Sequence, residues 1–339
     1  VDSAVSAMLL CRGGYDVTGV FIKTWQPDYV ECTWRSDRHD AMRVAAQLGI
    51  KFLTLDLEKS YKEDVIDYML SEFKNGVTPN PDIMCNRYIK FGGFWDFAKS
   101  KGADYIATGH YAKILKTKDS MSNLTKSEMF VASDSSKDQS YFLYRLNSQE
   151  MQHIIFPLGD KLKSEVRRLA LVNNLWVSNK KDSQGICMLG DLNIKDFLKH
   201  EINVSPGVVL DEEAKVIGEH DGAVLYTIGE RHGFKIYNNK TSSSAMYVVD
   251  KDVANNTITV SSQMDVNRDR GAQNQSTLVI RIKDESWILS APNIGTEYSA
   301  RGRYRAELAT VKCISSTEFE VVSGVIIRVP GQSLVIYDG

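Results

Sequence analysis

The feature that most constrains this sequence is the alternation of helical and strand-like patterns through its first half. Apolar residues recur at helical spacing, and each such stretch is followed by a short β-rich run after a glycine. We expect helices over 3–14, 41–48 and 66–73, and strands over 17–22, 52–57 and 105–108. This alternation predicts an α/β fold built on a doubly wound parallel sheet, with ligands bound in the loops that follow the strands.

The second half of the chain has a different texture, because short β-rich runs separated by turn residues replace the helical pattern. The expected strands lie over 207–210, 224–228, 246–249, 257–260, 278–282, 298–304, 309–314, 319–322 and 334–337. We therefore expect an α/β domain over 1–192, a central β-rich domain over 193–264 and a C-terminal β-barrel over 265–339.

Length and charge limit the kind of protein that this chain can be. Its 339 residues are too many for one ordinary domain. The formal net charge of −2 means that any surface for nucleic acid is a local basic patch. No apolar stretch is long enough for a membrane-spanning helix, so we expect no membrane partner and a cytoplasmic protein.

The five cysteines form no CxxC pair, which argues against a disulfide framework or a zinc site. Cys11 and Cys313 lie in apolar patterns typical of a core, and Cys32 lies in a polar loop as an exposed thiol. A functional cysteine in this chain is expected to work as a thiol.

The segment TPNPDIMCNRYIKFG, residues 78–92, presents a cysteine directly after two prolines. Proline forces an extended turn, so Cys85 is expected to open a helix and to be presented rather than buried. The helix N-terminus and the nearby Arg87 and Lys90 are expected to lower its pKa and favour the thiolate. Asp82 is close enough in sequence to act as an acid or base.

A second cysteine, Cys187, ends the polar segment KKDSQGIC over 180–187. A thiol after a glycine-containing loop flanked by lysines is reachable, although a structural role fits this position equally well. Cys85 and Cys187 are 187 − 85 = 102 residues apart, so only the fold can bring them together.

Two places suit a nucleotide. Asp2 and Ser3 begin the first expected helix, whose free N–H groups attract anions, although a plain helix cap is the alternative. In ATGHYAK, Gly109 and His110 follow an expected strand, where backbone can approach a nucleotide closely. A histidine in a loop is also often structural.

Two further segments carry groups suited to phosphate or bases. The first, SKDQSYFLYRL, mixes charged and aromatic residues but also suits an ordinary polar turn. In the second, Arg301, Arg303 and Arg305 alternate and would share one face of a strand, with Tyr304 opposite. A solvated charged strand is the alternative interpretation.

Taken together, these segments resemble the tRNA-specific 2-thiouridylase family of PP-loop ATP pyrophosphatases, in the same order and across essentially the whole chain. The most diagnostic pieces are TPNPDIMCNRYIKFG, ATGHYAK, KDQSYFLYRL, KKDSQGIC, GEHDGAVLYTIGERHG and PGQSLVIYDG. The family begins with a loop of the form SGGxDS, of which Val1, Asp2 and Ser3 are present here. We expect residues upstream to complete the phosphate cradle and to strengthen ATP binding.

The resemblance implies a tRNA-uridine 2-sulfurtransferase that uses ATP and Mg²⁺. ATP adenylates the C2 oxygen of a wobble uridine, and persulfide sulfur then gives 2-thiouridine, AMP and pyrophosphate. In this scheme Cys187 carries the persulfide, Cys85 is the nucleophile that releases sulfur and closes a disulfide with Cys187, and Asp82 assists proton transfer.

The same resemblance implies the binding residues and the partners. ATP is expected at Val1, Asp2, Ser3, Ile22 and Gly109. The tRNA is expected at Asn80, Pro81, Asp82, His110, Lys137, Asp138, Gln139, Arg303, Tyr304 and Gln332. No residue is expected to hold a resident metal. Expected partners are the tRNAs for Lys, Glu and Gln and a persulfide donor, either a cysteine desulfurase or a sulfur-relay protein, with the chain itself a monomer.

Two alternatives stay open at this point. Another ATP pyrophosphatase, such as an amide-forming synthetase, would adenylate a carbonyl without needing two cysteines. A non-catalytic RNA-binding protein would keep the scaffold and never form AMP.

Overall fold

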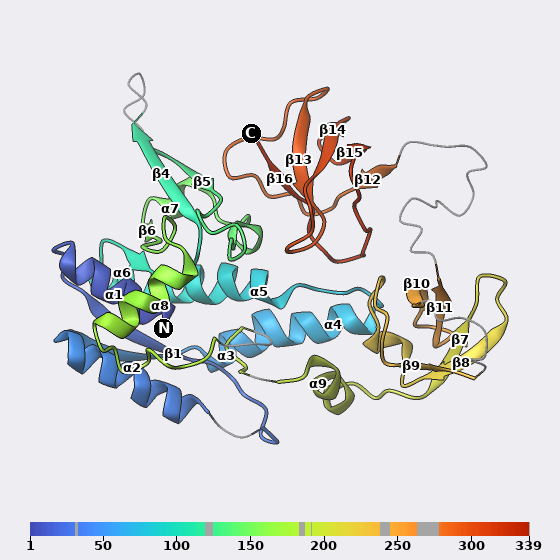
Figure 1. The fold of residues 1–339 in the computed structure, drawn as a ribbon, viewed down its shortest axis with the longest axis horizontal. Coiled ribbons are helices and arrows are strands. Elements are labelled where there is room, and N and C mark those ends of the chain that lie inside the picture. The colour runs from blue at the N-terminus through green and yellow to red at the C-terminus, as the bar shows by residue number, and fades with distance from the viewer. Residues whose placement is uncertain are drawn as a thin grey trace. The chain divides into compact units, whose positions relative to one another are not determined.

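The chain folds as two units, seen in a computed structural model that describes residues 1–30, 33–118, 125–182, 187–190, 192–237, 245–262 and 278–338 (Figure 1). The first unit consists of Val1–Ile66, Pro81–Leu192 and Ser286–Ser290, and the second of Asp67–Asn80, Asn193–Glu285 and Ala291–Gly339. The expected exposed thiol Cys32 and the expected domain boundary at 264 lie outside the described residues.

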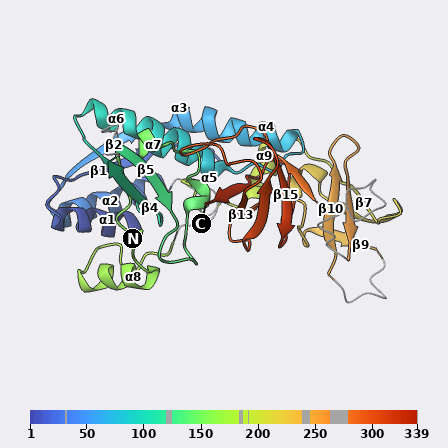
Figure 2. The same cartoon turned by 90° about the horizontal axis from the view of Figure 1, so that it is seen from above.

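Parallel strand pairs form the centre of the first unit. Strand β1 (Thr18–Lys23) pairs in parallel with β2 (Lys51–Asp56), and β3 (Ile106–Ala107) pairs in parallel with β6 (Ile154–Ile155). Parallel neighbours need a long crossover, and helix α2 (Trp34–Leu48) provides it between β1 and β2. Figure 2 shows helices on both sides of the β1–β2 pair, which identifies an α/β unit.

The other elements of the first unit surround these pairs. They are α1 (Asp2–Arg12), α3 (Glu58–Tyr61), the hairpin of β4 (Lys113–Lys118) and β5 (Thr125–Phe130), α7 (Ser148–Met151) and α8 (Lys163–Val172). Val5 of α1, Val44 of α2 and Val166 of α8 are buried in one apolar cluster. This cluster fixes α1 and α8 beside each other, which positions the charged residues described below.

A nearly continuous helical run, Pro81–Ser100, carries the first cysteine. It consists of α5 (Pro81–Met84), a π-helical segment (Cys85–Gly93) and α6 (Phe94–Ser100). Proline suits the first helical position because an N–H group there would have no partner within the helix. In a π-helix the hydrogen bonds run from residue i to i+5, so Cys85 and Lys90 lie on one face.

The second unit contains two five-stranded sheets. One has the order β10-β11-β7-β8-β9 and the other β12-β15-β14-β13-β16. In the first sheet β11 and β7 are parallel, and every pairing in the second is antiparallel. The strands are β7 (Gly207–Leu210), β8 (Val216–His220), β9 (Phe234–Ile236), β10 (Tyr247–Asp252), β11 (Thr257–Ser261), β12 (Val279–Arg281), β13 (Glu297–Arg301), β14 (Ala309–Cys313), β15 (Glu318–Ser323) and β16 (Val335–Tyr337). Helices α4 (Tyr68–Lys74) and α9 (Ile194–Glu201) complete this unit.

Two strand predictions in this unit are wrong. The stretch 224–228 is not a strand, because Gly222 turns the chain at a φ of 144° into a short 3₁₀ turn, Ala223–Leu225. The expected strand over 298–304 ends at Arg301, and Arg305 has a left-handed φ of 62°. The three arginines therefore do not share a strand face; Arg301 lies over the ring of Tyr337 instead.

Candidate active site

Two cysteine sulfurs meet in the first unit although they are far apart in sequence. The Sγ atoms of Cys85 and Cys187 are 3.5 Å apart, with the Cys85 thiol donating to the Cys187 sulfur. A disulfide needs about 2.05 Å, so a movement of about 1.5 Å would join them. Cys85 is fully buried, whereas Cys187 is partly exposed. Cys187 is thus the more exposed of the two residues.

Side chains from two other elements hold the backbone of Cys187. Its N–H donates to Oδ1 of Asp82 at 3.0 Å, and its carbonyl accepts from the hydroxyl of Tyr61 at 2.5 Å. Burial raises the pKa of Asp82, although the hydrogen bond from Cys187 opposes this. A raised pKa makes a carboxylate a stronger proton acceptor than an ordinary one.

The pKa values of the two thiols are shifted in opposite directions. The hydrogen bond from Cys85, helped by the positive charge of Lys90, lowers the pKa of Cys187 to about 7 against the effects of burial and Asp82. That same hydrogen bond, together with burial, raises the pKa of Cys85. When one of the two thiols ionises, the negative charge is therefore favoured on Cys187.

The prediction that Cys85 is presented as a thiolate is wrong. The π-helical turn directs it inward, where it is 0% exposed. Arg87, expected to lower its pKa, pairs with Glu150 instead.

Lys90 lies near the sulfurs, and His110 contacts Lys90. The ammonium of Lys90 donates to Oδ1 of Asn86 at 3.0 Å and contacts Nε2 of His110 at 3.4 Å. His110 is buried, and burial together with the charge of Lys90 holds its pKa well below the ordinary value. Its other ring nitrogen, Nδ1, lies 2.7 Å from the hydroxyl of Thr108. His110 is thus a neutral ring with partners inside the protein.

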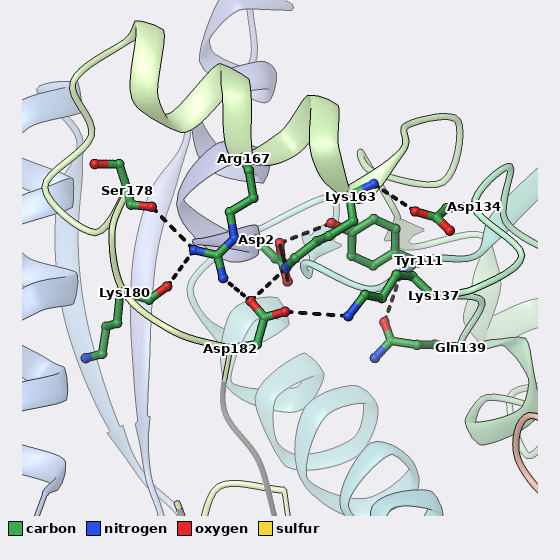
Figure 3. A network of polar contacts seen from close by, with 10 residues as sticks. All are labelled: Asp2, Tyr111, Asp134, Lys137, Gln139, Lys163, Arg167, Ser178, Lys180 and Asp182. Atoms are coloured by element: carbon green, nitrogen blue, oxygen red, sulfur yellow. Dashed lines mark hydrogen bonds and ion pairs between the residues drawn. The ribbon is translucent and has the colours of Figure 1, made fainter.

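A charged network lies at the N-terminal end of α1 (Figure 3). Both carboxylate oxygens of Asp2 accept from Nζ of Lys163, at 2.7 and 2.8 Å, and the Tyr111 hydroxyl donates to Asp2 at 3.1 Å. Asp182 gathers three cations around one carboxylate: Lys163 at 2.9 Å, Lys137 at 3.6 Å and Arg167. Cations gathered at a helix N-terminus form an environment suited to phosphate.

Close backbone packing explains Gly109. A Cβ atom there would lie 2.8 Å from both Cβ of Asp2 and the backbone nitrogen of Ser3. Only glycine lets the loop after β3 approach the start of α1 so closely. Ile22 lies in β1 and is partly buried, and Val1 directly precedes α1.

The residues expected to contact tRNA fall into several environments. Asp138 is buried and accepts from Ala132 N at 2.9 Å, which braces its own loop. Gln139 accepts from Tyr111 N at 2.9 Å, which ties this loop to the loop after β3. Within the second unit, Gln332 donates to the carbonyls of Thr78 and Pro79 at 2.9 and 3.2 Å. Asn80, Arg303 and Tyr304 also belong to that unit, and Pro81 begins α5.

Sequence reasoning missed Lys163, Arg167 and Asp182. Lys163 and Arg167 are four residues apart at the start of an amphipathic helix, which places them on one face. That spacing was a usable signal, but nothing in the sequence links α8 to α1.

The described residues contain neither a metal-binding cluster nor a membrane-spanning helix. Among them, no group of three or more His, Cys, Asp or Glu side chains has an arrangement that could hold a metal ion. No helix within the described ranges has both the length and the apolar character needed to cross a membrane.

Comparison with known proteins gives consistent matches. Residues 1–191 match the model of the tRNA methyl transferase HUP domain, and residues 195–262 match that of the tRNA methyl transferase PRC-barrel domain. The tRNA-specific 2-thiouridylase MnmA 2 of Aliarcobacter butzleri is 40% identical over 100% of this chain and 93% of its own length. The tRNA-specific 2-thiouridylases MnmA of Lactobacillus helveticus and Bacillus subtilis are each 39% identical over 100% of this chain and 90% of their own lengths.

These matches and the parallel strand pairs define the class: an α/β HUP-domain protein that also carries a PRC-barrel domain. Relatives named as tRNA-specific 2-thiouridylases align along the whole chain. The chain belongs to the tRNA-specific 2-thiouridylase family.

Proposed function

We propose that this chain is a tRNA-uridine 2-sulfurtransferase, which converts the wobble uridine of tRNA to 2-thiouridine with release of AMP and pyrophosphate. The observation that carries this proposal is the 3.5 Å contact between the sulfurs of Cys85 and Cys187, beside Asp82. Sulfur delivery from a persulfide breaks one S–S bond, and a second thiol in contact is the group needed to form the replacement bond.

The sulfur steps follow from the positions of the two thiols. The Cys187 thiolate attacks the outer sulfur of a donor persulfide, and the donor leaves as a thiolate, so that Cys187 becomes a persulfide. Cys85 then loses its proton and attacks the Cys187 sulfur. This forms the disulfide and releases hydrosulfide. An external thiol reductant restores both cysteines. Asp82, with its raised pKa, is placed to take up the proton.

The acceptor steps use ATP as co-substrate. The uridine C2 oxygen attacks the α-phosphorus, pyrophosphate leaves, and the C2 oxygen is activated as an adenylate. Hydrosulfide adds at C2 and AMP departs with the oxygen, leaving the thiocarbonyl. Activation is needed because the carbonyl oxygen is otherwise a poor leaving group.

ATP fits at the N-terminal end of α1. Three cations there suit the triphosphate: Lys137, Lys163 and Arg167. The close approach of Gly109 to Asp2 would let the loop backbone pack against the bound triphosphate. We propose that Val1, Asp2, Ser3, Ile22 and Gly109 bind ATP.

Mg²⁺ needs only one or two carboxylates besides phosphate oxygens, and Asp2 and Asp182 fit that requirement. The ion would neutralise phosphate charge when bound.

The tRNA assignments are proposals of the same kind. Asn80, Pro81 and Asp82 would contact the target base, which must leave its stack to reach the sulfurs. The remaining tRNA contacts would come from His110, Lys137, Asp138, Gln139, Arg303, Tyr304 and Gln332. The exposed state of Arg305 and the partial exposure of Arg303 agree with a phosphate-facing loop.

The domain organisation proposed for this function has three parts: a catalytic α/β domain over 1–192 with a doubly wound parallel sheet, a β-rich domain over 193–264 that binds tRNA, and a C-terminal β-barrel over 265–339. The separate family matches to 1–191 and 195–262 support the first division. We propose that the protein works as a monomer in the cytoplasm, where thiols are kept reduced. Its sulfur donor would be a cysteine desulfurase or a sulfur-relay protein.

Nucleoside mass spectrometry tests the proposal. The protein is incubated with ATP, Mg²⁺, a persulfide donor and unmodified tRNA, and the digested tRNA is analysed. We expect uridine in which sulfur has replaced oxygen, formed with AMP, and none with Cys187→Ala or Cys85→Ala. A methylated nucleoside, or product from Cys187→Ala, would contradict sulfur transfer. Binding of tRNA without AMP formation would identify a non-catalytic RNA-binding protein.

A further inference from the structure

Lys90 is a cation placed beside the two sulfurs by an arrangement of neutral groups. It lies five residues after Cys85 on the π-helical segment, which places both residues on the same face. An ammonium has three hydrogens to donate. One goes to Oδ1 of Asn86 at 3.0 Å and one is directed at Nε2 of His110 at 3.4 Å.

Both neutral acceptors are themselves fixed. The amide nitrogen of Asn86 donates to the carbonyl of Phe142 at 3.1 Å, which turns its oxygen toward Lys90. Because Nε2 of His110 accepts from Lys90, its hydrogen lies on Nδ1, which donates to the Thr108 hydroxyl at 2.7 Å. Neither acceptor carries a charge that could neutralise the ammonium.

The charge of Lys90 also interacts with the two sulfurs. Burial opposes the charge on Lys90, whereas the negative charge that Cys187 can carry is the largest influence raising its pKa, followed by smaller ones from Cys85 and Asp82. Within the described parts of the chain, Lys90 forms no ion pair with a carboxylate. The Cys187 sulfur and the Asp82 carboxylate are thus the groups whose negative charge this cation can match.

We propose that Lys90 is a positioning residue that holds the sulfur of Cys187 as an anion, ready to attack the outer sulfur of an incoming persulfide. The inference rests on the proposed sulfurtransferase function, which it deepens by assigning the cation for sulfur loading. Other titratable groups lie near Lys90 and the Cys187 sulfur: Asp82 and Cys85 from the helical run, Tyr61 from α3, and His110 from the loop after β3, which contacts Lys90.

Persulfide loading explains why this charge matters. The Cys187 thiolate bonds to the outer donor sulfur while the donor S–S bond breaks and its electrons leave with the donor thiolate. The rate depends on the fraction of Cys187 that is already a thiolate. A neutral residue at position 90 would leave Cys187 largely protonated near pH 7.

The test measures Cys187 alkylation in the full chain without ATP or tRNA. Iodoacetamide is applied over a range of pH, and modification of the peptide holding residue 187 is followed by mass spectrometry. We expect Lys90→Met and Lys90→Gln to raise the apparent pKa of Cys187 by about one unit, which lowers the rate near pH 7 roughly five-fold and leaves it unchanged near pH 9. Lys90→Arg should stay close to wild type.

Controls separate charge from structure. Lys99→Met removes an exposed lysine from α6 and should leave the pH profile unchanged. Lys90→Gln keeps hydrogen-bonding groups for Asn86 and His110. It therefore tests the role of the charge if Lys90→Met does not fold. A folded neutral variant with the wild-type pH profile, or one slowed equally at every pH, would overturn the proposal. If the profile shifts as expected but no 2-thiouridine forms in the complete reaction, the proposed function fails and the role of Lys90 stands.

Discussion

The proposed function gives Asp82 two roles that substitution can separate. Its Oδ1 holds the N–H of Cys187 at 3.0 Å, and its raised pKa suits proton exchange. A hydrogen bond to a charged group contributes about 1.5–3 kcal/mol, which corresponds to a roughly 10- to 150-fold preference for the anchored position of Cys187. Asp82→Ala loses the anchor and the acid–base group, whereas Asp82→Asn keeps an acceptor oxygen and loses only the proton exchange.

We therefore expect Asp82→Asn to lower the rate of 2-thiouridine formation by roughly 10²- to 10⁴-fold, the usual contribution of general acid–base catalysis. Asp82→Ala should lose a further factor from the anchor. Because the charge of Asp82 raises the pKa of Cys187, both variants should alkylate Cys187 faster than wild type below pH 7.

Single-turnover assays with nucleoside mass spectrometry measure the rate, with Asp96→Asn, an exposed carboxylate on α6, as the matched control. A wild-type rate in Asp82→Asn would refute the proton-transfer role. Equal rates in the two Asp82 variants would instead refute the importance of the anchor.

Three further predictions follow from the site. In wild type, the alkylation rate of Cys187 should be half-maximal near pH 7 and fall as the pH drops through that value, while Cys85 stays unmodified. Peptide mass spectrometry measures both, and equal labelling of the two cysteines would contradict the assigned pKa shifts. Lys163→Met should weaken ATP binding roughly 10- to 150-fold by calorimetry, since a charge-assisted contact is lost; unchanged affinity would place the triphosphate elsewhere. Gly109→Ala should lower the free energy of unfolding by about 1–3 kcal/mol, because its Cβ would clash with Asp2; denaturant unfolding at wild-type stability would show that the loop yields freely.

Local patterns predicted the α/β half of the chain well. Periodicity located α1, α2, β1 and β2, because each shows its period over enough residues to be read. Single turns decided the failures: Gly222 bends 224–228 away from a strand, and the left-handed Arg305 follows the end of β13. Such φ values depend on tertiary packing that a period does not encode.

The sequence singled out candidate site residues but not their arrangement. Cys85, Asp82 and Cys187 stood out by their sequence neighbours, yet their contact depends on the fold that closes 102 residues of chain. The acidity of the thiols was assigned to the wrong cysteine, because a sequence does not reveal that a π-helical turn buries Cys85. The cations on α8 were missed because nothing in the sequence links α8 to α1.

The most direct test of sulfur transfer is the state of the two cysteines after one turnover. Persulfide is loaded on Cys187, excess donor is removed, and ATP, Mg²⁺ and unmodified tRNA are added without reductant. Peptide mass spectrometry then measures the disulfide between residues 85 and 187 alongside 2-thiouridine. We predict one disulfide for each thiolated uridine. Thiolated tRNA formed while both cysteines remain free thiols would contradict the account.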